Sequence, residues 1–534
     1  MMSNDDILEA LEITAKLMEL HNENPFKTKA YTNAAYKLSK LRYDFEGKTQ
    51  EEIESIEGIG KGISAKIVEL ITTGSTKDLS DLVEKTPAGV IQMLGVKGLG
   101  PKKVRQLSLE LQVESIGELL YACNENRLIG LKGFGEKTQL AVKQNIEFKI
   151  LNTNKFHYAA LEKPLMKLVD VIRENQPGIQ VCLIGQMARK DEVIDKLDML
   201  MDAEIKIDIS ALEKTIPLPM HYEVCKPDEF FYKSVEFSAK PEHLEKINFS
   251  SLSHKKFESE KEVYAALNLQ YIEPELREGL GEVERARKNK IPKLIELSDL
   301  KGILHNHSTY SDGVHTLKQM ADRCKEMGYG YFGICDHSKT AVYAQGLPIE
   351  RVLDQFKEIE KLNKTYSGFT ILKGIESDIL NDGSLDYPEE ILKQFDFIVA
   401  SVHSNLKMNE EKATDRLLKA IENPYTSILG HPTGRLLLAR NGYPIDHKKI
   451  IDACSANKVS IELNAHPYRL DIDWRWIPYC MEKGVLIAIN PDAHHMDGFN
   501  DLYYGVCAAR KGMLDKENCL NALSLNELLQ KFKK

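Results

Sequence analysis

The sequence predicts a multidomain protein of the α+β and α/β classes, with a helical region, a mixed region and a C-terminal β/α barrel. Three observations lead to this prediction. The chain has 534 residues, which is too many for a single hydrophobic core. Residues 1–150 contain three similar glycine segments between helical stretches. After residue 300, seven short apolar runs alternate with amphipathic stretches, as expected for β/α units around a mostly parallel sheet or barrel. We therefore expect regions at 1–150, 151–295 and 300–534.

The composition is that of a soluble globular protein, with 43% hydrophobic and 28% charged residues. No apolar run is long enough for a transmembrane helix, so we expect no membrane partner. The acidic start, MMSNDDILEALEI, lacks the basic-then-apolar order of a signal peptide. The nine cysteines are scattered without a CxxC pair, which favours reduced thiols in the cytoplasm. A net charge of −9 argues against nucleic-acid binding by bulk electrostatics.

The glycine segments of the helical region are IEGIGKGISAKI (56–67), VKGLGPKKVRQL (96–107) and LKGFGEKTQLAV (131–142). In each, two glycines flank an apolar residue and a helical stretch follows, so backbone N–H groups at the helix start are free to bind a phosphate. One copy is equally well explained as a helix connector, but three copies favour contact with the DNA backbone. Because residues 1–150 hold 20 basic and 22 acidic residues, this contact depends on local geometry. The candidate DNA-binding residues are Gly58, Gly60, Gly62, Gly98, Gly100, Lys102, Gly133 and Gly135.

These segments resemble the helix-hairpin-helix motif of DNA repair proteins. Together with NPFKTKAYTNAAYKL (24–38), the first of them resembles the amino-terminal domain of family X DNA polymerases. In some members that domain has a lyase lysine that forms a Schiff base with an abasic sugar, and Lys66 stands at the matching place. A lyase role requires a lowered lysine pKa. The alternative is an ordinary solvated helix lysine.

The middle region is expected to contain strands at VCLIG (181–185) and EIKIDIS (204–210). Its order of elements, ending in PELREGLGEVERA (274–286), resembles the palm and thumb of family X polymerases. Nucleotidyl transfer needs carboxylates that hold two Mg²⁺ ions. Gln186 replaces the expected serine, Lys196-Leu197-Asp198 replaces Asp-x-Asp, and Cys225 stands near the third aspartate. We therefore expect a palm that is inactive as a polymerase.

The C-terminal apolar runs are GILHNH, YFGICDH, TILKGIE, FIVASVH, SILGH, VSIELN and VLIAINPDAH, and six of them end in His or Glu. In a β/α barrel these strand ends converge on one mouth. Nearby residues complete a set of nine candidate metal ligands: His305, His307, Asp312, His337, Glu376, His403, His431, Asp492 and His494. Mixed imidazole and carboxylate ligands suit Zn²⁺, Mn²⁺ or Fe²⁺, and the absence of cysteine argues against a closed structural zinc site. A multinuclear hydrolytic site fits this set.

Residues 300–510 resemble the PHP (polymerase and histidinol phosphatase) family, with all nine ligand positions filled. The resemblance implies a distorted seven-stranded barrel with up to three divalent ions. It assigns one metal to His305, His307, Glu376 and Asp492, a second to Glu376, His403 and His431, and a third to Asp312, His337 and His494. Arg469 and Asp471, with Asn464 and Arg435, are candidates for phosphate binding or catalysis at the mouth, with loop salt bridges as the alternative. His315, His466 and His495 are expected not to be ligands.

The order of the three regions resembles the bacterial and archaeal PolX family along nearly the whole chain. That resemblance implies a cytoplasmic DNA repair protein, in base excision repair, whose PHP domain is a 3′–5′ exonuclease that also processes abasic sites or 3′ ends. We expect a monomer that binds gapped, nicked or 3′-ended DNA. The alternatives are a phosphatase of the histidinol phosphatase type, an active gap-filling polymerase, and a non-catalytic DNA-binding scaffold.

Overall fold

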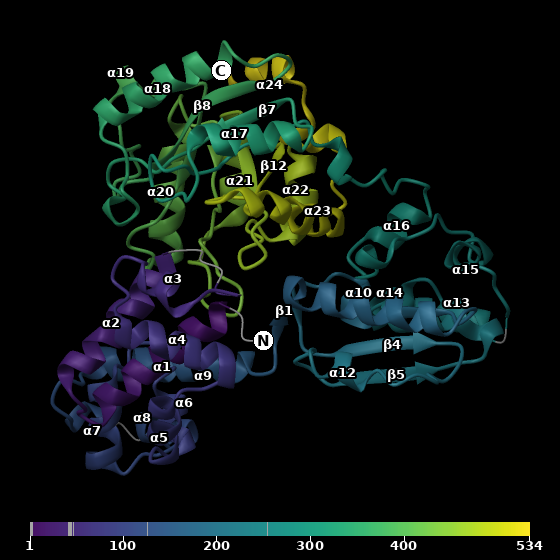
Figure 1. Ribbon diagram of the computed structural model, residues 1–534. Coiled ribbons are helices and arrows are strands. Elements are labelled where there is room, and N and C mark those ends of the chain that lie inside the picture. The colour runs from purple at the N-terminus through teal and green to yellow at the C-terminus, as the bar shows by residue number, and fades with distance from the viewer. Residues whose placement is uncertain (1–3, 41–44, 46, 125–126, 254, 534) are drawn as a thin grey trace. The chain divides into compact units, whose positions relative to one another are not determined.

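The computed structural model describes residues 4–40, 45, 47–124, 127–253 and 255–533 (Figure 1). The chain divides into two compact units, Met1–Thr153 and Asn154–Lys534. The first boundary lies close to the one expected at residue 150. The middle region and the barrel belong to one unit, so a boundary between them near residue 300 stays a prediction. No described helix is long and apolar enough to cross a membrane.

The first unit is helical, as predicted. Its helices are α1 (Asn4–Leu20), α2 (Pro25–Lys40), α3 (Gln50–Glu54), α4 (Lys61–Thr73), α5 (Lys77–Glu84), α6 (Ala88–Met93), α7 (Pro101–Leu111), α8 (Ile116–Asn124) and α9 (Glu136–Asn152). They share one hydrophobic core, in which Leu11, Ile67 and Leu107 are fully or almost fully buried. The amphipathic stretches between the glycine segments thus form short helices that cannot bury their apolar faces alone and pack together.

The three glycine segments fold in the same way. Gly58, Gly98 and Gly133 have φ of 91°, 91° and 86°, the left-handed region that side chains disfavour. Helices α4, α7 and α9 each begin three residues later, and Gly60 and Gly100 are the N-caps of the first two. The repeat in the sequence is therefore a repeat of one turn geometry.

The second unit starts with a small mixed domain. Its three-stranded sheet has the order β2 (Val181–Ile184), β4 (Leu197–Met201), β5 (Met220–Val224), and helix α10 (Tyr158–Asn175) packs beside β2. A separate two-stranded sheet pairs β1 (Phe156–His157) antiparallel with β3 (Val193–Ile194). The expected strand at 181–185 is confirmed.

The expected strand at 204–210 is wrong. The segment is extended, but the side chain of Gln176 takes the place of a neighbouring strand: its Nε2 donates to Glu204 O at 2.9 Å and its Oε1 accepts from Lys206 N at 3.0 Å. The alternating Ile205 and Ile207 are partly buried against the core of this domain, which explains the strand-like pattern. The remaining α-helices described before the barrel are α11 (Gly185–Ala188), α12 (Ser210–Glu213), α13 (Phe230–Ser238), α14 (Pro241–Lys246), α15 (Glu260–Ala266) and α16 (Glu282–Ala286).

All seven predicted strands of the C-terminal region are present and pair in parallel. The sheet order is β12 (Ile487–Asn490), β11 (Ser460–Asn464), β10 (Ile428–Leu429), β9 (Phe397–Ser401), β8 (Thr370–Asp378), β7 (Tyr331–Ile334) and β6 (Gly302–Ile303). A parallel bridge between Asn306 and Ala493 brings the two edges together, so the sheet nearly closes into a barrel. The strands are apolar on both faces because helices cover the outside (Figure 1). These helices include α17 (Leu317–Glu326), α18 (Ile349–Asn363), α20 (Glu410–Glu422), α21 (His447–Ala456), α22 (Ile477–Glu482) and α23 (Leu502–Lys511).

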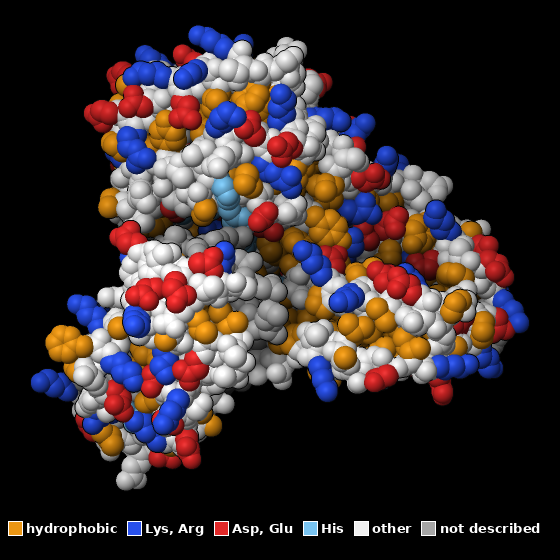
Figure 2. Space-filling model, viewed as in Figure 1, with side chains coloured by type: hydrophobic (Ala, Val, Ile, Leu, Met, Phe, Trp, Pro, Cys, Tyr) orange, Lys and Arg blue, Asp and Glu red, His pale blue; other side chains and the backbone are white. Residues whose placement is uncertain are grey.

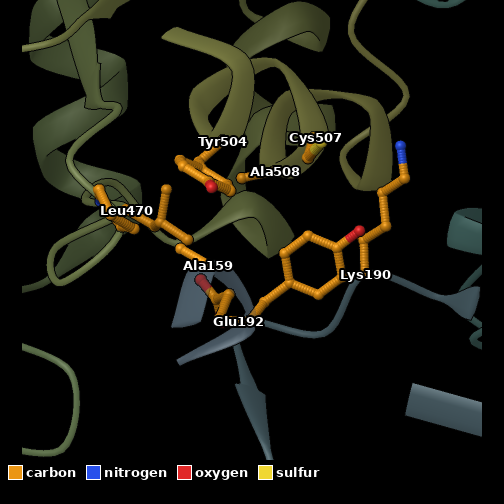
Figure 3. Close-up of a pocket in the computed structure, with 9 residues that line it drawn as sticks. Ala159, Lys190, Glu192, Leu470, Tyr504, Cys507 and Ala508 are labelled. Atoms are coloured by element: carbon orange, nitrogen blue, oxygen red, sulfur yellow. The ribbon is translucent and has the colours of Figure 1, made fainter. Parts of the chain in front are cut away.

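The mixed domain and the barrel contact each other through buried and partly buried ion pairs within the second unit. The Lys511 ammonium, 3% exposed as a residue, donates to Arg189 O, Asp191 Oδ1 and Glu278 Oε1 at 2.7, 2.9 and 2.8 Å. The Arg435 guanidinium lies 2.5 Å from Glu192 Oε1. Figure 3 shows the small cavity beside these pairs, where side chains of the mixed domain face those of α23.

Candidate metal centre

The C-terminal ends of the barrel strands bring all nine predicted ligands together. Four groups have ligand atoms within 4.8 Å of one another: His307, Asp312, His337 and His494; His305, Glu376 and His431; His305, His307 and Asp492; and His337, Glu376 and His403. Among the described residues, every group of this kind lies in the barrel. The groups share members, so they form one continuous centre rather than separate sites.

Glu376 is the hub of this centre. It lies near the end of β8, is 1% exposed, and its Oε1 is 3.2 Å from His305 Nε2, 3.1 Å from His403 Nε2 and 3.0 Å from His431 Nε2. Its other oxygen is 2.8 Å from His337 Nδ1. A carboxylate with two oxygens among four imidazoles can bridge two cations.

Several buried ligand atoms of this centre lie close to one another but form no hydrogen bond. His305 Nε2, His337 Nδ1 and Glu376 Oε2 are buried and have no hydrogen-bond partner among the described residues, although each lies near the others' ligand atoms. A buried polar atom left unsatisfied costs about 1–3 kcal/mol. These residues belong to groups whose ligand atoms lie within 4.8 Å of one another, and the donor set of imidazoles and carboxylates suits divalent metal ions. The residues present therefore fit a divalent metal centre.

The electrostatics of the centre keep its carboxylates ionised. Burial would raise the pKa of Glu376, but His403, His305 and His337 hold it well below its usual range. Burial would likewise raise the pKa of Asp492, and His305 and His307 hold it down. Burial lowers the pKa of His307 to about 3, and His494 and His337 add to this effect. His307 is therefore neutral, as a metal ligand must be. Neighbouring carboxylates, despite burial, raise the pKa of His403 to about 10 and that of His494 to about 9, so metal binding would displace protons from these two rings.

The third group lies at the open side of the centre. The side chains of Asp312 and His494 are 32% and 36% exposed, and their Oδ1 and Nε2 atoms are 3.4 Å apart. His337, which is buried, lies 3.7 Å from the same Asp312 oxygen. The mouth of the barrel thus leaves one metal-ligand group accessible to a substrate.

Three buried acidic residues that hold the ligands were not among the predicted site residues. Glu462 Oε2 accepts from His305 Nδ1 at 2.6 Å, and Asp378 Oδ1 accepts from His403 Nδ1 at 2.6 Å. Both bonds fix the tautomer that presents Nε2 to the centre. Asp336 accepts from the backbone and hydroxyls of Ser308 and Ser311, which positions the loop that carries Asp312. A signal was present in the sequence, since all three are acidic residues within or directly after apolar strands.

The candidate residues for phosphate binding lie in different surroundings. Arg469 is near the centre, with its Nε 3.9 Å from Asp492 Oδ2 and 23% of its side chain exposed. Asp471 is buried and accepts from Thr433 N at 3.0 Å, so it helps to hold the loop after His431; its action at the mouth stays a prediction. Arg435 binds Asp473, Glu192 and backbone carbonyls, which is the loop salt bridge named as its alternative.

Asn464 donates to Asp492 Oδ2 at 3.1 Å and therefore supports a ligand. His315, His466 and His495 belong to none of the ligand groups found among the described residues. Each instead accepts a hydrogen bond from a nearby backbone N–H, of Met496, Tyr468 and Gly498 respectively.

Lys66 does not have the environment of a Schiff-base lysine. Its Nζ lies 2.8 Å from Glu69 Oε2 and 3.7 Å from Asp78 Oδ2. The hydrogen bond to Glu69 raises the pKa of Lys66, and nearby Asp78 adds to the increase. A nucleophilic amine needs the opposite shift.

The sheet of the mixed domain has two acidic side chains near His221, Asp198 on β4 and Glu223 on β5. Asp198 on β4 lies 2.7 Å from Lys196 Nζ and 3.3 Å from His221 Nδ1. His221 is its register partner on β5, and Cys225, expected near the third carboxylate position, directly follows the end of that strand. Gln186 Oε1 accepts from the backbone N–H groups of Asp195 and Lys196. A lysine thus neutralises the Asp198 carboxylate.

The glycine turns leave their backbone open. A Cβ placed on Gly60, Gly98, Gly100, Gly133 or Gly135 would meet nothing within 4 Å. Gly62 is equally open, while Gly58 approaches the side chain of Lys37 at 3.3 Å. On the face seen in Figure 2, basic and acidic side chains are interspersed. Open N–H groups at helix starts, rather than a basic patch, are what these turns offer to a phosphate.

Comparison with known proteins matches both ends of the chain. The family models that match describe a helix-hairpin-helix domain at residues 2–76 and a PHP domain at residues 304–466. A probable phosphatase of Acetivibrio thermocellus is 29% identical over 199 residues, which are 36% of this chain and 78% of that protein. A probable phosphatase of Thermoanaerobacter sp. is 30% identical over 189 residues, 31% of this chain and 74% of that protein.

The DNA polymerase/3′-5′ exonuclease PolX of Bacillus subtilis is 33% identical over 566 aligned residues, which cover 99% of both chains. The alignment therefore includes the helical first unit with its glycine turns (the hairpin unit), the mixed domain (the palm-like domain) and the barrel with its candidate metal centre. This chain belongs to the PolX family.

Proposed function

We propose that this protein is a metal-dependent DNA repair nuclease that hydrolyses phosphodiester bonds in the 3′–5′ direction at the mouth of its C-terminal barrel. The observation that carries the proposal is the complete ligand centre, in which nine side chains from six strand ends converge with buried atoms left unpaired. The glycine turns would hold the backbone of gapped, nicked or 3′-ended DNA. We place this activity in the cytoplasm, where cysteines that form no disulfide are usual.

We assign up to three ions to the centre. His305, His307, Glu376 and Asp492 would hold one, Glu376, His403 and His431 a second, and Asp312, His337 and His494 the third. The four groups of close ligand atoms agree with this division in part. They differ from it in two points: His307 also joins the exposed group, and His337 also lies in a group with Glu376. The mixed nitrogen and oxygen ligands favour Mn²⁺, Zn²⁺ or Fe²⁺ over Ca²⁺ or Mg²⁺.

Bound divalent ions would supply a hydroxide nucleophile at neutral pH and neutralise charge on the phosphate. The residues of the chain do the rest. Glu462 and Asp378 hold the His305 and His403 rings in place. Arg469, at the edge of the centre, is placed to bind a phosphate oxygen through its guanidinium. The buried walls around Glu376 exclude bulk water and strengthen these charge interactions.

The palm-like domain would not catalyse nucleotidyl transfer. Asp198 is neutralised by Lys196, and its strand neighbour is His221. One carboxylate beside an ammonium cannot hold two divalent cations against a triphosphate. In this proposal the domain remains as part of the protein body, and the protein does not fill gaps.

A phosphatase acting on small phosphomonoesters is the second candidate. The two probable phosphatases match about a third of this chain, and the chain has a PHP domain at residues 304–466. The hairpin unit has no role in such a reaction, which is why we favour DNA as the substrate.

One experiment tests the candidates together. The purified protein with Mn²⁺ is incubated with a labelled 3′-recessed duplex, with and without dNTPs, and separately with a phosphomonoester. We expect the wild type to shorten the strand, His307→Ala and Asp492→Ala to lose the activity, and His315→Ala, a matched histidine outside the ligand groups, to keep it. Phosphomonoester turnover without DNA shortening would favour the phosphatase, and extension with dNTPs would refute the silent palm.

A further inference from the structure

Two adjacent apolar side chains stand exposed on the turn after metal ligand His337. Val342 is 80% exposed and Tyr343 is 67% exposed. A single exposed apolar residue is ordinary on a protein surface. Two neighbours on one short 3-10 turn, Val342–Ala344, beside a hydrolytic centre call for a physical explanation.

The Tyr343 ring lies at the mouth of the centre. Its centroid is 6.1 Å from the ring of His337 and 6.5 Å from the ring of His403. The ring is therefore largely exposed to solvent and also lies close to two candidate metal ligands.

The turn that presents Tyr343 is braced. Thr340 Oγ1 donates to Asp378 Oδ2 at 2.7 Å, which ties the turn to the carboxylate that also holds His403. Gly346 N donates to Ala341 O at 3.0 Å, and a Cβ on Gly346 would clash with Ser338 O at 1.9 Å. An aromatic ring on a rigid support loses little freedom when a flat partner stacks on it.

We propose that Tyr343, supported by Val342, is a stacking platform for the unpaired base of the 3′-terminal nucleotide; this inference rests on the proposed nuclease function. In a nucleotide, the base is one sugar away from the phosphate, so a phosphate at the centre places the base among the residues of the rim. Every base has a flat face, so the platform accepts all four without reading sequence. The nucleotide that enters is unpaired, because a base in a duplex already stacks and pairs.

The test compares two labelled duplexes with the same single-stranded 3′ tail. One tail ends in an ordinary nucleotide and the other in a tetrahydrofuran residue, which has the sugar and phosphate but no base. Full-length wild type, Tyr343→Ala and Tyr343→Phe are assayed with Mn²⁺, and bound metal is measured for each. Stacking on one base is worth about 1–3 kcal/mol, so Tyr343→Ala should raise KM for the ordinary end roughly 5- to 150-fold.

We expect Tyr343→Ala to leave KM for the baseless end and the metal content unchanged, and Tyr343→Phe to match the wild type on both ends. An unchanged KM of Tyr343→Ala on the ordinary end, while the wild type degrades DNA, would overturn the platform alone. An equal loss on both ends would also overturn it, because it would indicate damage to the centre. A wild type that degrades neither substrate would remove the proposed function and the platform with it.

Discussion

Glu462→Gln tests whether a buried carboxylate behind the ligands controls metal affinity. Each oxygen of Glu462 accepts two hydrogen bonds: Oε2 from His305 Nδ1 at 2.6 Å and Asn490 Nδ2 at 3.0 Å, and Oε1 from His431 N at 3.2 Å and Asn464 Nδ2 at 3.3 Å. Glutamine has the same shape, but its NH₂ group would face two donors in either orientation. The variant therefore loses two hydrogen bonds and the negative charge beside the His305 ring.

The expected loss follows from these contacts. Removing a partner of a metal-ligating histidine weakens metal binding about 10- to 100-fold, or ~1.4–2.8 kcal/mol. Metal-stripped protein would be titrated with Mn²⁺ by calorimetry, with circular dichroism to verify folding. Glu360→Gln serves as the control, since Glu360 pairs with Lys373 and its side chain is 61% exposed. A folded Glu462→Gln protein that binds Mn²⁺ within twofold of the wild type would refute the reasoning.

Three further predictions concern other parts of the chain. Burial would raise the pKa of Glu278, but Lys511 and Lys240 hold it at about 2, below its ordinary value of 4.5; this carboxylate therefore stabilises the fold above pH 4.5 and loses that contribution as the pH falls towards 2. Glu278→Gln should lower the urea midpoint at pH 7 by an amount that shrinks below pH 4.5, and a difference that is constant with pH would contradict this. Because Lys66 is ion-paired, borohydride should trap no adduct between the wild type and a 5′-incised abasic site, and a trapped adduct lost in Lys66→Ala would reverse this conclusion. Gly98→Ala places a side chain at φ 91°, which costs roughly 1–2 kcal/mol of conformational free energy. This variant should bind DNA more weakly in fluorescence anisotropy, whereas the control Gly117→Ala in α8 should not. Equal affinities of the two variants would argue against this turn as a DNA contact.

The barrel and its ligands were predictable because their signals are local. Each ligand follows a short apolar run, and the strand end fixes which side of the barrel it faces. His305 and His307 illustrate this, since both come directly after β6 and both reach the centre. The three glycine turns were predictable for the same reason, because φ values near 90° select glycine at one position of each turn.

Contacts between distant segments left no such signal. Glu192 and Arg435 are 243 residues apart, and no spacing in the sequence distinguishes Arg435 as an ion-pair partner from Arg435 as a phosphate ligand. The expected strand at 204–210 failed because the side chain of Gln176 satisfies its backbone. Glu462 was missed because its function depends on which ring it faces, 157 residues away along the chain.

The ion pairs between the palm-like domain and the barrel bear on how such a protein changes over evolution. Glu192 reaches the Arg435 guanidinium, which also binds Asp473 and the carbonyls of Arg469 and Leu470 in the loop beside the centre. Lys511 depends on the same domain for all three of its buried partners. A domain can therefore lose its own reaction and still be retained by selection, because deleting it would leave the neighbouring nuclease without part of its interior.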